Sequence, residues 1–113
     1  MIGVVDSGST KAHWVFMENG QLVAEFFTVG LNPNSTSAEV LMLEISSVRD
    51  RLPNLEKLQS IYFYGSGCLS QHGSSIVNGA LVHYFSNSEI FVESDLVAAG
   101  IALYGRGWWR SWV

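Results

Sequence analysis

Hydrophobic positions along the chain fall into five short runs that predict β-strands. The runs are residues 2–5, 13–18, 21–28, 61–64 and 90–92. Each run is three to eight residues long, which is a usual length for a strand. The fourth is rich in branched and aromatic side chains, as strands are. Asn19 and Gly20 separate the second run from the third and are the strongest two-residue signal for a hairpin. The chain is therefore expected to open with one strand followed by a hairpin.

Hydrophobic residues spaced three or four apart predict three helices. The three stripes are Leu41, Ile45, Val48 and Leu52; Val77, Ala80, Leu81 and Tyr84; and Leu96, Ala99, Gly100 and Leu103. Thr36 and Glu39 have the spacing of a capping box, which predicts that Thr36 caps the first helix. Pro53 ends that helix, because proline has no N–H and its ring clashes with the preceding turn. The third helix is expected to begin near Asp95.

The order of these elements, β-β-β-α-β-α-β-α, predicts an α/β fold without a linker or an internal repeat. Strands that alternate with helices imply a largely parallel sheet that is covered by helices on both faces. Ligands of such sheets gather at the carboxyl ends of the strands. Those ends hold Asp6, Gly65 and Asp95. Topology alone therefore predicts a binding site among these residues.

Composition narrows the classes of protein that this pattern allows. The 113 residues fit one domain, and ten acidic against six basic side chains give a net charge of −4, which argues against binding to nucleic acid or an anionic membrane. A single cysteine excludes an internal disulfide. The first residues lack the features of a signal peptide, and the longest apolar run, 96–104, is too short to span a bilayer, so we expect a cytoplasmic protein. A 48% apolar content predicts surface left for a partner to cover.

The segment between the first strand and the hairpin carries candidate chemistry for a phosphate. Its residues are Asp6, Ser7, Gly8, Ser9, Thr10 and Lys11. Gly8 permits left-handed backbone angles that let successive N–H groups converge on an anion, and the hydroxyls and Lys11 add donors and charge. Asp6 could hold a hydrated Mg²⁺, which prefers oxygen ligands and keeps its waters. The alternative is an ordinary turn built from common turn residues.

Asp95 follows the last predicted strand, at or beside the start of a helix. One interpretation is a simple N-cap, a position that Asp95 or Ser94 fills well. The other is a general base that accepts a proton from a hydroxyl nucleophile. The helix dipole would keep its carboxylate ionised, which is the form that a base requires. Spacing alone favours the cap.

Two loops offer further polar groups. Asn32, on a loop stiffened by Pro33, presents an amide suited to sugar hydroxyls, and Ser66 lies in a glycine-rich loop that could approach a ligand closely. Both segments are also explained by ordinary loop chemistry. Cys68 has no activating neighbour and is expected to be structural. The three histidines, His13, His72 and His83, show no metal-ligand spacing.

Four segments, in this order and spacing, resemble the actin-like ATPase superfamily. They are IGVVDSGSTK at 2–11 with the hairpin at 19–20, TVGLNPN at 28–34, YFYGSGC at 62–68 and SDLVAA at 94–99. That superfamily joins sugar kinases, heat-shock chaperones and actin on a ribonuclease-H-like sheet. The resemblance therefore implies an α/β domain with a mixed five-stranded sheet and helices on both faces. Within the superfamily the segments look like N-acetylglucosamine kinase and its bacterial relatives, and the related activator ATPases of the benzoyl-CoA reductase type share much of the pattern.

This resemblance implies a kinase that uses ATP and Mg²⁺ to phosphorylate the 6-hydroxyl of N-acetylglucosamine or a similar amino sugar. Asp6 would serve Mg-ATP, holding the metal through water. The phosphate end would be lined by Gly8, Ser9, Thr10 and Lys11. Asn32 and Ser66 would contact the sugar, and Asp95 would be the catalytic base, while still capping its helix.

The resemblance extends from residue 2 to residue 105, where the family continues with a second phosphate loop and a second domain. Residues 106–113, RGWWRSWV, resemble no element of the family. We therefore expect an N-terminal lobe at 1–105 and a non-family tail at 106–113 from a truncated or frameshifted reading frame. Such a lobe is expected to be inactive alone, and to pair through apolar surface with the missing lobe or a second copy. The alternatives are an activator-type ATPase lobe and a non-catalytic sugar- or nucleotide-binding domain.

Overall fold

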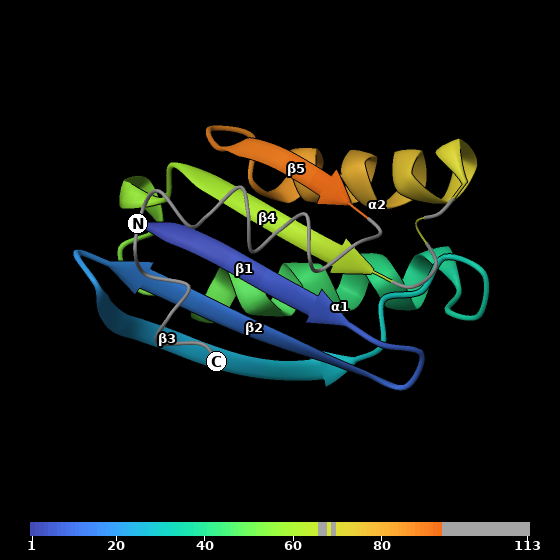
Figure 1. Ribbon diagram of the computed structural model, residues 1–113, viewed down its shortest axis with the longest axis horizontal. Coiled ribbons are helices and arrows are strands. Elements are labelled where there is room, and N and C mark those ends of the chain that lie inside the picture. The colour runs from blue at the N-terminus through green and yellow to red at the C-terminus, as the bar shows by residue number, and fades with distance from the viewer. Residues whose placement is uncertain (66–67, 69, 94–113) are drawn as a thin grey trace.

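The computed structural model describes residues 1–65, 68 and 70–93, which form a five-stranded sheet and two α-helices (Figure 1). The strands are β1 (Ile2–Ser7), β2 (Lys11–Glu18), β3 (Gln21–Val29), β4 (Ser60–Gly65) and β5 (Glu89–Glu93). The helices are α1 (Ala38–Arg51) and α2 (Gln71–Tyr84), with a short 3₁₀ turn, η1 (Leu55–Lys57), before β4. The helix predicted to begin near Asp95 lies outside the described residues.

The strands lie in the order β3-β2-β1-β4-β5. β1 pairs antiparallel with β2, and β2 antiparallel with β3, whereas β1–β4 and β4–β5 are parallel pairs. The predicted mixed sheet is therefore confirmed. Because β1, β4 and β5 run in the same direction, their carboxyl ends share one edge, where Ser7 lies beside Gly65 and Tyr64 lies beside Glu93.

The predicted hairpin joins β2 to β3 through Asn19 and Gly20. Both residues have positive φ, 53° and 77° respectively. A two-residue turn of this kind matches the twist of the flanking strands, and asparagine and glycine tolerate the left-handed region better than other residues. The local sequence therefore determines this turn.

The turn between β1 and β2 is shorter than predicted. Asp6 and Ser7 belong to β1, and β2 begins at Lys11, so only residues 8–10 lie outside the strands. The cause is pairing on both sides of β1: Asp6 lies in register with His13 on β2 and with Tyr64 on β4. Two neighbouring strands thus extend β1 beyond the apolar run that predicted it.

The capping box predicted at Thr36 is wrong. The N-cap of α1 is Ser37, whose side chain accepts a hydrogen bond from the Val40 N–H at 3.2 Å. Thr36 instead donates its hydroxyl to the Gly30 carbonyl at 2.6 Å, so its side chain is committed to the preceding loop. The other end of α1 is as predicted, since Leu52 is the C-cap and Pro53 follows it.

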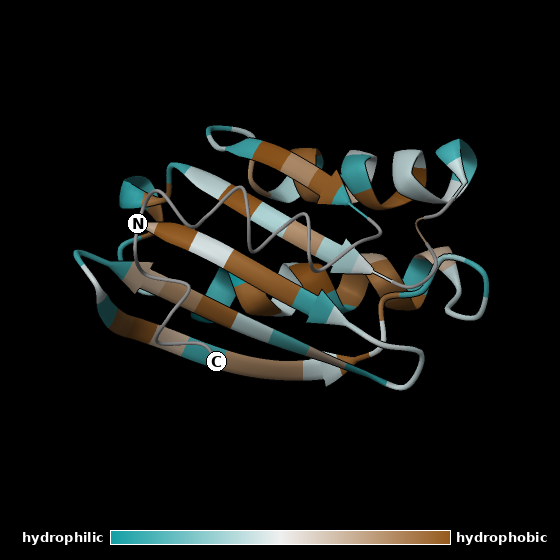
Figure 2. Cartoon of the chain, viewed as in Figure 1, coloured by the Kyte–Doolittle hydropathy of each residue, from teal (hydrophilic) through white to brown (hydrophobic). Residues whose placement is uncertain are grey.

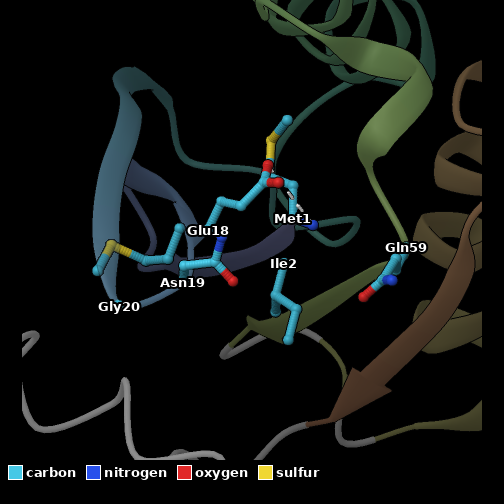
Figure 3. Close-up of a pocket in the computed structure, with 7 residues that line it drawn as sticks. Met1, Ile2, Glu18, Asn19, Gly20 and Gln59 are labelled. Atoms are coloured by element: carbon cyan, nitrogen blue, oxygen red, sulfur yellow. Dashed lines mark ion pairs between the residues drawn. The ribbon is translucent and has the colours of Figure 1, made fainter.

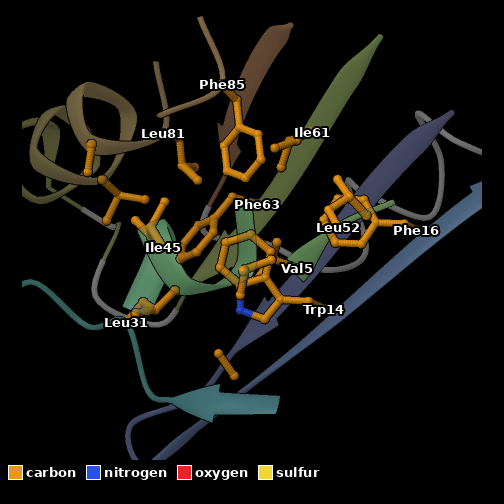
Figure 4. Packing of buried hydrophobic residues seen from close by; sticks show 14 of the residues in the cluster. Val5, Trp14, Phe16, Leu31, Ile45, Leu52, Ile61, Phe63, Leu81 and Phe85 are labelled. Carbon is orange, nitrogen blue, oxygen red and sulfur yellow. The ribbon is translucent and has the colours of Figure 1, made fainter. Parts of the chain in front are cut away.

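Both helices pack on one face of the sheet, behind it in the view of Figure 1, and form a single core there. The predicted stripes are confirmed, because α1 buries Leu41, Ile45 and Val48, and α2 buries Val77, Ala80 and Leu81. These side chains meet the inward-facing residues of the central strands, among them Trp14, Phe16 and Phe63 (Figure 4). Figure 2 shows hydrophobic residues along the strands of the sheet and on the two helices.

The opposite face of the sheet, termed here the second face, carries its own apolar cluster. Its buried members are Val4, Val15, Met17, Tyr62 and Tyr64. They alternate with the residues of the main core along each strand, as the pleat requires. Within the described residues, both helices lie on the face opposite this cluster. The prediction of helices on both faces stays a prediction, because the third predicted helix lies outside the described residues.

Candidate functional site

The candidate phosphate segment is a tight turn at the carboxyl end of β1. The Gly8 N–H donates to the Lys11 carbonyl at 2.9 Å and closes the turn, while Gly8, Ser9 and Thr10 are exposed to solvent. Asp6 is exposed on the second face, whereas Ser7 is buried and points to the opposite side. The Gly8 N–H is used to close the turn, so the groups that remain for a ligand are the backbone and hydroxyls of the exposed Ser9 and Thr10, with Asp6 at the end of the preceding strand.

The left-handed glycine predicted at this turn is not found. Among the described glycines only Gly20 has a positive φ, so Gly8 adopts an angle that any residue tolerates. A Cβ added at Gly8 would meet nothing closer than the Lys11 carbonyl oxygen at 3.5 Å, which is an ordinary contact. The extension of β1 and β2 leaves residues 8–10 outside the strands, and none of these three has a positive φ.

Gly30 is the glycine on which the site depends, and the sequence analysis missed it. A Cβ at Gly30 would lie 2.5 Å from the Gly8 carbonyl oxygen and 2.7 Å from the Ser9 backbone. The Leu31 N–H also donates to the buried Ser7 Oγ at 2.8 Å. The loop after β3 therefore packs backbone to backbone against the phosphate turn. The sequence carries no local signal for this contact, because its partners are more than twenty residues apart.

Asn32 lies on this loop and organises it. Its Oδ1 accepts the Asn34 N–H at 2.9 Å, and its backbone carbonyl accepts the N–H groups of Ser35 and Thr36 at 3.0 and 2.7 Å. One side-chain acceptor is thus used locally, as is usual in an Asx turn. The loop that carries Asn32 is joined to the phosphate turn through its first two residues, Gly30 and Leu31. Asn32 therefore follows directly on the contact with residues 7–9.

Lys11 extends along the second face rather than into the turn. Its Nζ lies 5.0 Å from the centroid of the Phe27 ring. The same ring stacks on His13 at 4.5 Å, and His13 Nε2 lies 2.5 Å from Glu25 Oε2. A cation over an aromatic face is attracted by the ring quadrupole. The ammonium group is therefore held near the turn by an aromatic neighbour, at the same edge as Asp6.

Across the sheet, Glu93, Tyr64, Asp6 and His13 lie side by side in register on the second face. Burial and the nearby Glu93 carboxylate, with a smaller contribution from Tyr62, raise the pKa of Tyr64 well above its ordinary value. Tyr64 therefore keeps its phenolic proton at physiological pH. The row combines two carboxylates with a hydroxyl donor, which are groups suited to oxygen-rich ligands and hard cations.

The remaining predicted site residues have different outcomes. Ser66 and Asp95 lie outside the described residues, and Asp95 comes two positions after Glu93 in the sequence.

Cys68 is buried and its N–H donates to the Gly65 carbonyl at 3.1 Å. Burial raises the pKa of the Cys68 thiol, so the unreactive thiol form dominates, as expected for a structural cysteine. No cluster of three potential metal ligands occurs among the described side chains.

A cavity lies at the other end of the sheet, around the hairpin turn (Figure 3). Its volume is about 470 Å³, and its lining includes Met1, Glu18, Asn19 and Gln59. The Met1 ammonium group donates to the Lys57 carbonyl at 3.0 Å and lies 3.9 Å from Glu18 Oε2. Because the carboxyl ends of the parallel strands are at the opposite edge, this cavity is separate from the candidate site.

The Ser7–Leu31 hydrogen bond can be tested by mutation. Ser7→Ala leaves the buried Leu31 N–H without an acceptor, and we expect the free energy of unfolding to fall by about 1–2 kcal/mol in urea titrations of the full chain. Ser86→Ala is the control, because Ser86 is exposed after α2 and should change the stability by less than about 0.5 kcal/mol. Equal losses in the two variants would contradict the structural role of Ser7.

Comparison with known proteins places this geometry in a wider context. No protein-family profile matches the chain, and no curated protein matches it. A solved structure of a candidate N-acetylglucosamine kinase from Porphyromonas gingivalis superposes with a TM-score of 0.74 and 30% sequence identity, covering 93% of this chain. The chain is one lobe of the actin-like ATPase fold. The resemblance identified in the sequence is thereby confirmed for the fold and for the relationship to that protein.

This lobe spans 38% of the length of the Porphyromonas gingivalis protein. A second solved structure, YeaZ from Pseudomonas aeruginosa, aligns with 17% identity and a TM-score of 0.47, covering 95% of this chain and 51% of that chain. The described part of the lobe contains no helix that combines the length and the apolarity needed to cross a bilayer.

Proposed function

We propose that this lobe is the N-terminal part of an ATP-dependent sugar kinase that phosphorylates the 6-hydroxyl of N-acetylglucosamine or a similar amino sugar. The observation that carries the proposal is the contact between the phosphate turn and the Asn32 loop. The Leu31 N–H to Ser7 Oγ bond and the fit of Gly30 against Gly8 hold the two segments together. Phosphoryl transfer depends on placing acceptor and phosphate next to each other, which this contact favours.

The exposed turn would bind the phosphate end of ATP. Ser9 and Thr10 would offer backbone N–H groups and hydroxyls, Gly8 would line the phosphate end while its N–H closes the turn, and Lys11 would supply a positive charge at the same edge. Such donors suit phosphate oxygens, and they need no rearrangement of the strands to reach a ligand. Asn32 would donate its amide N–H groups to sugar hydroxyls from the adjoining loop.

Asp6 fits a hydrated Mg²⁺. It is an exposed carboxylate at the end of β1, and Mg²⁺ in phosphoryl-transfer sites is commonly held by one or two carboxylates, waters and the phosphates themselves. When bound, the ion would neutralise charge on the phosphates. The role of this chain would be to hold the ion through Asp6 and its waters, beside the donors of the turn.

Asp95 would accept the proton of the sugar hydroxyl, and Ser66 would contact the sugar. Both roles rest on the resemblance of their segments to those of N-acetylglucosamine kinases. A base with an ionised carboxylate near the acceptor hydroxyl is the group that such a transfer requires. Adenosine binding would come from the second lobe, so the isolated chain should bind ATP weakly and turn over negligibly.

A chimera tests the proposal, in which residues 1–105 replace the matching segment of the Porphyromonas gingivalis protein. We expect release of ADP that requires N-acetylglucosamine, and a loss of kcat of about 10²–10⁴-fold in the Asp95→Asn chimera. Asp50→Asn, on the exposed surface of α1, is the matched control and should leave kcat unchanged. Activity that survives Asp95→Asn would refute the assignment of the base.

The same chimera separates the two other hypotheses. ADP release without any sugar would favour an activator-type ATPase. Sugar binding without ADP release would favour a non-catalytic binding domain. If the chimera does not fold, titration of the full chain with N-acetylglucosamine, followed through the backbone NMR shifts of Asn32 and Gly8, gives a second measurement. Shifts that ignore the sugar would contradict the placement of the sugar at this loop.

A further inference from the structure

An exposed apolar row lies on β3, the outermost strand of the sheet. Leu22, Phe27 and Val29 are 57%, 55% and 44% exposed, respectively. They pair with Met17, His13 and Lys11 of β2, so all three lie on the second face, away from α1 and α2. We call these three residues the β3 row. Phe27 and Val29 are neighbours on this face, and the exposed Glu25 separates them from Leu22. Exposed large apolar side chains gathered on one strand are candidates for a surface that another segment covers.

The composition of residues 106–113 is complementary to this row. The segment holds three tryptophans within five positions, Trp108, Trp109 and Trp112, and two cations, Arg106 and Arg110. Glu25 lies between Leu22 and Phe27 on the same face of β3, and its side chain is 44% exposed. Large aromatic rings match apolar side chains, and arginines match the exposed part of the Glu25 carboxylate, whose Oε2 already lies against His13.

The segment can reach the row from the end of β5. Four strand spacings separate β5 from β3, which is about 19 Å at 4.8 Å a strand. Twelve residues lie between Glu93 and Arg106, and a chain of that length can reach up to about 40 Å. The distance across the sheet therefore does not prevent the contact.

A symmetric pairing with a second copy is less suited to this edge. Glu25 is the middle residue of the nine in β3, so antiparallel pairing of two β3 strands about their centres would bring two Glu25 carboxylates face to face. Like charges directly opposite each other destabilise a strand pair. The acidic centre thus disfavours a second copy, whereas it favours a segment that carries arginines.

We propose that residues 106–113 dock on the β3 row of their own chain, with tryptophan rings covering Leu22, Phe27 and Val29. The tail that resembles no kinase element then has a structural role, as an apolar cover for the open edge of the lobe. The proposal does not depend on the kinase assignment. The row borders the candidate site, because Lys11 pairs with Val29 and its Nζ lies 5.0 Å from the Phe27 ring.

Acrylamide quenching of tryptophan fluorescence in the full chain tests this docking. Trp14 is fully buried, so accessible quenching reports on the three tail tryptophans. The test variant is Leu22→Ser with Phe27→Ser, two exposed positions whose replacement should not unfold the sheet. The control is Leu43→Ser, which removes a 70% exposed leucine from α1 instead. Circular dichroism checks that all chains are folded, and size-exclusion chromatography over a range of concentrations reports the oligomeric state.

We expect the tail tryptophans of the monomeric chain to be protected from acrylamide, and this protection to be lost in the double variant but retained in Leu43→Ser. Quenching equal to that of a free tryptophan amide in the unchanged chain would overturn the proposal. Protection that survives the double variant would overturn it as well. Protection that appears only as the chain dimerises would assign the row to a second copy and would equally refute docking within one chain.

Discussion

Gly30→Ala is expected to lower the free energy of unfolding by about 3 kcal/mol, at the upper end of the range for overpacking. The added Cβ would lie 2.5 Å from the Gly8 carbonyl oxygen and 2.7 Å from the Ser9 carbonyl carbon and oxygen. All of these are backbone atoms, so no side chain can turn aside to relieve the clash. Either the turn or the loop must move, and urea unfolding monitored by far-UV circular dichroism measures the cost.

The matched control is Gly79→Ala on α2. A Cβ at Gly79 meets no atom within 4 Å, and alanine favours a helix interior, so this variant should gain about 0.5–1 kcal/mol of stability. Opposite signs for the same chemical change would show that contact, and not glycine loss in general, decides the outcome. If Gly30→Ala were as stable as the unchanged chain, the backbone contact between loop and turn would be disproved.

The same substitution bears on the proposed function. Displacing the loop would move Asn32 away from residues 8–10, because Leu31 and Gly30 are its attachment to the turn. In the chimera we therefore expect Gly30→Ala to raise the KM for the sugar, whereas Gly79→Ala should leave it unchanged. An unaltered KM together with lost stability would mean that Gly30 serves folding alone.

Trp14→Ala is expected to destabilise the chain by about 3–5 kcal/mol, the cost of removing a large buried aromatic side chain. Trp14 is fully buried on β2, with ring centroids 6.2 Å from Phe16 and 6.5 Å from Phe85 (Figure 4). Its Nε1–H donates to Thr28 Oγ1 at 3.1 Å, and that hydroxyl donates to the Val29 carbonyl at 3.0 Å. The residue therefore supports both the core and the strand that leads into the Asn32 loop. Thermal and urea unfolding measure the loss.

A double-mutant cycle separates packing from hydrogen bonding at this position. Trp14→Phe keeps much of the aromatic volume but loses the bond to Thr28, and Thr28→Val removes the acceptor. If the bond contributes, the combined variant should lose about 1 kcal/mol less than the sum of the two single losses. Strict additivity would mean that Trp14 stabilises the fold by packing only.

Periodicity and turn chemistry determined most of the elements of this protein. The strand-like runs at residues 13–18 and 21–28, with Asn19 and Gly20 between them, sufficed to predict the hairpin, because these two adjacent residues supply both positive φ angles. The stripe Leu41, Ile45 and Val48 predicted the buried side of α1 for the same reason: burial repeats with the helical turn. Element order then determined that the strand ends share one edge.

Only the tertiary structure decided how the site is assembled. Thr36 has the spacing of a capping residue, but its hydroxyl finds the Gly30 carbonyl, and Ser37 takes the cap. The sequence suggested that Gly8 is the essential glycine of the turn. In the structure β1 pairs with strands on both sides as far as Ser7, and Gly8 has an ordinary conformation. The glycine that has no room for a Cβ is Gly30. Each of these outcomes depends on segments that are distant in sequence. Local propensity acts between neighbours, whereas packing of loop against turn depends on the sheet that brings them together.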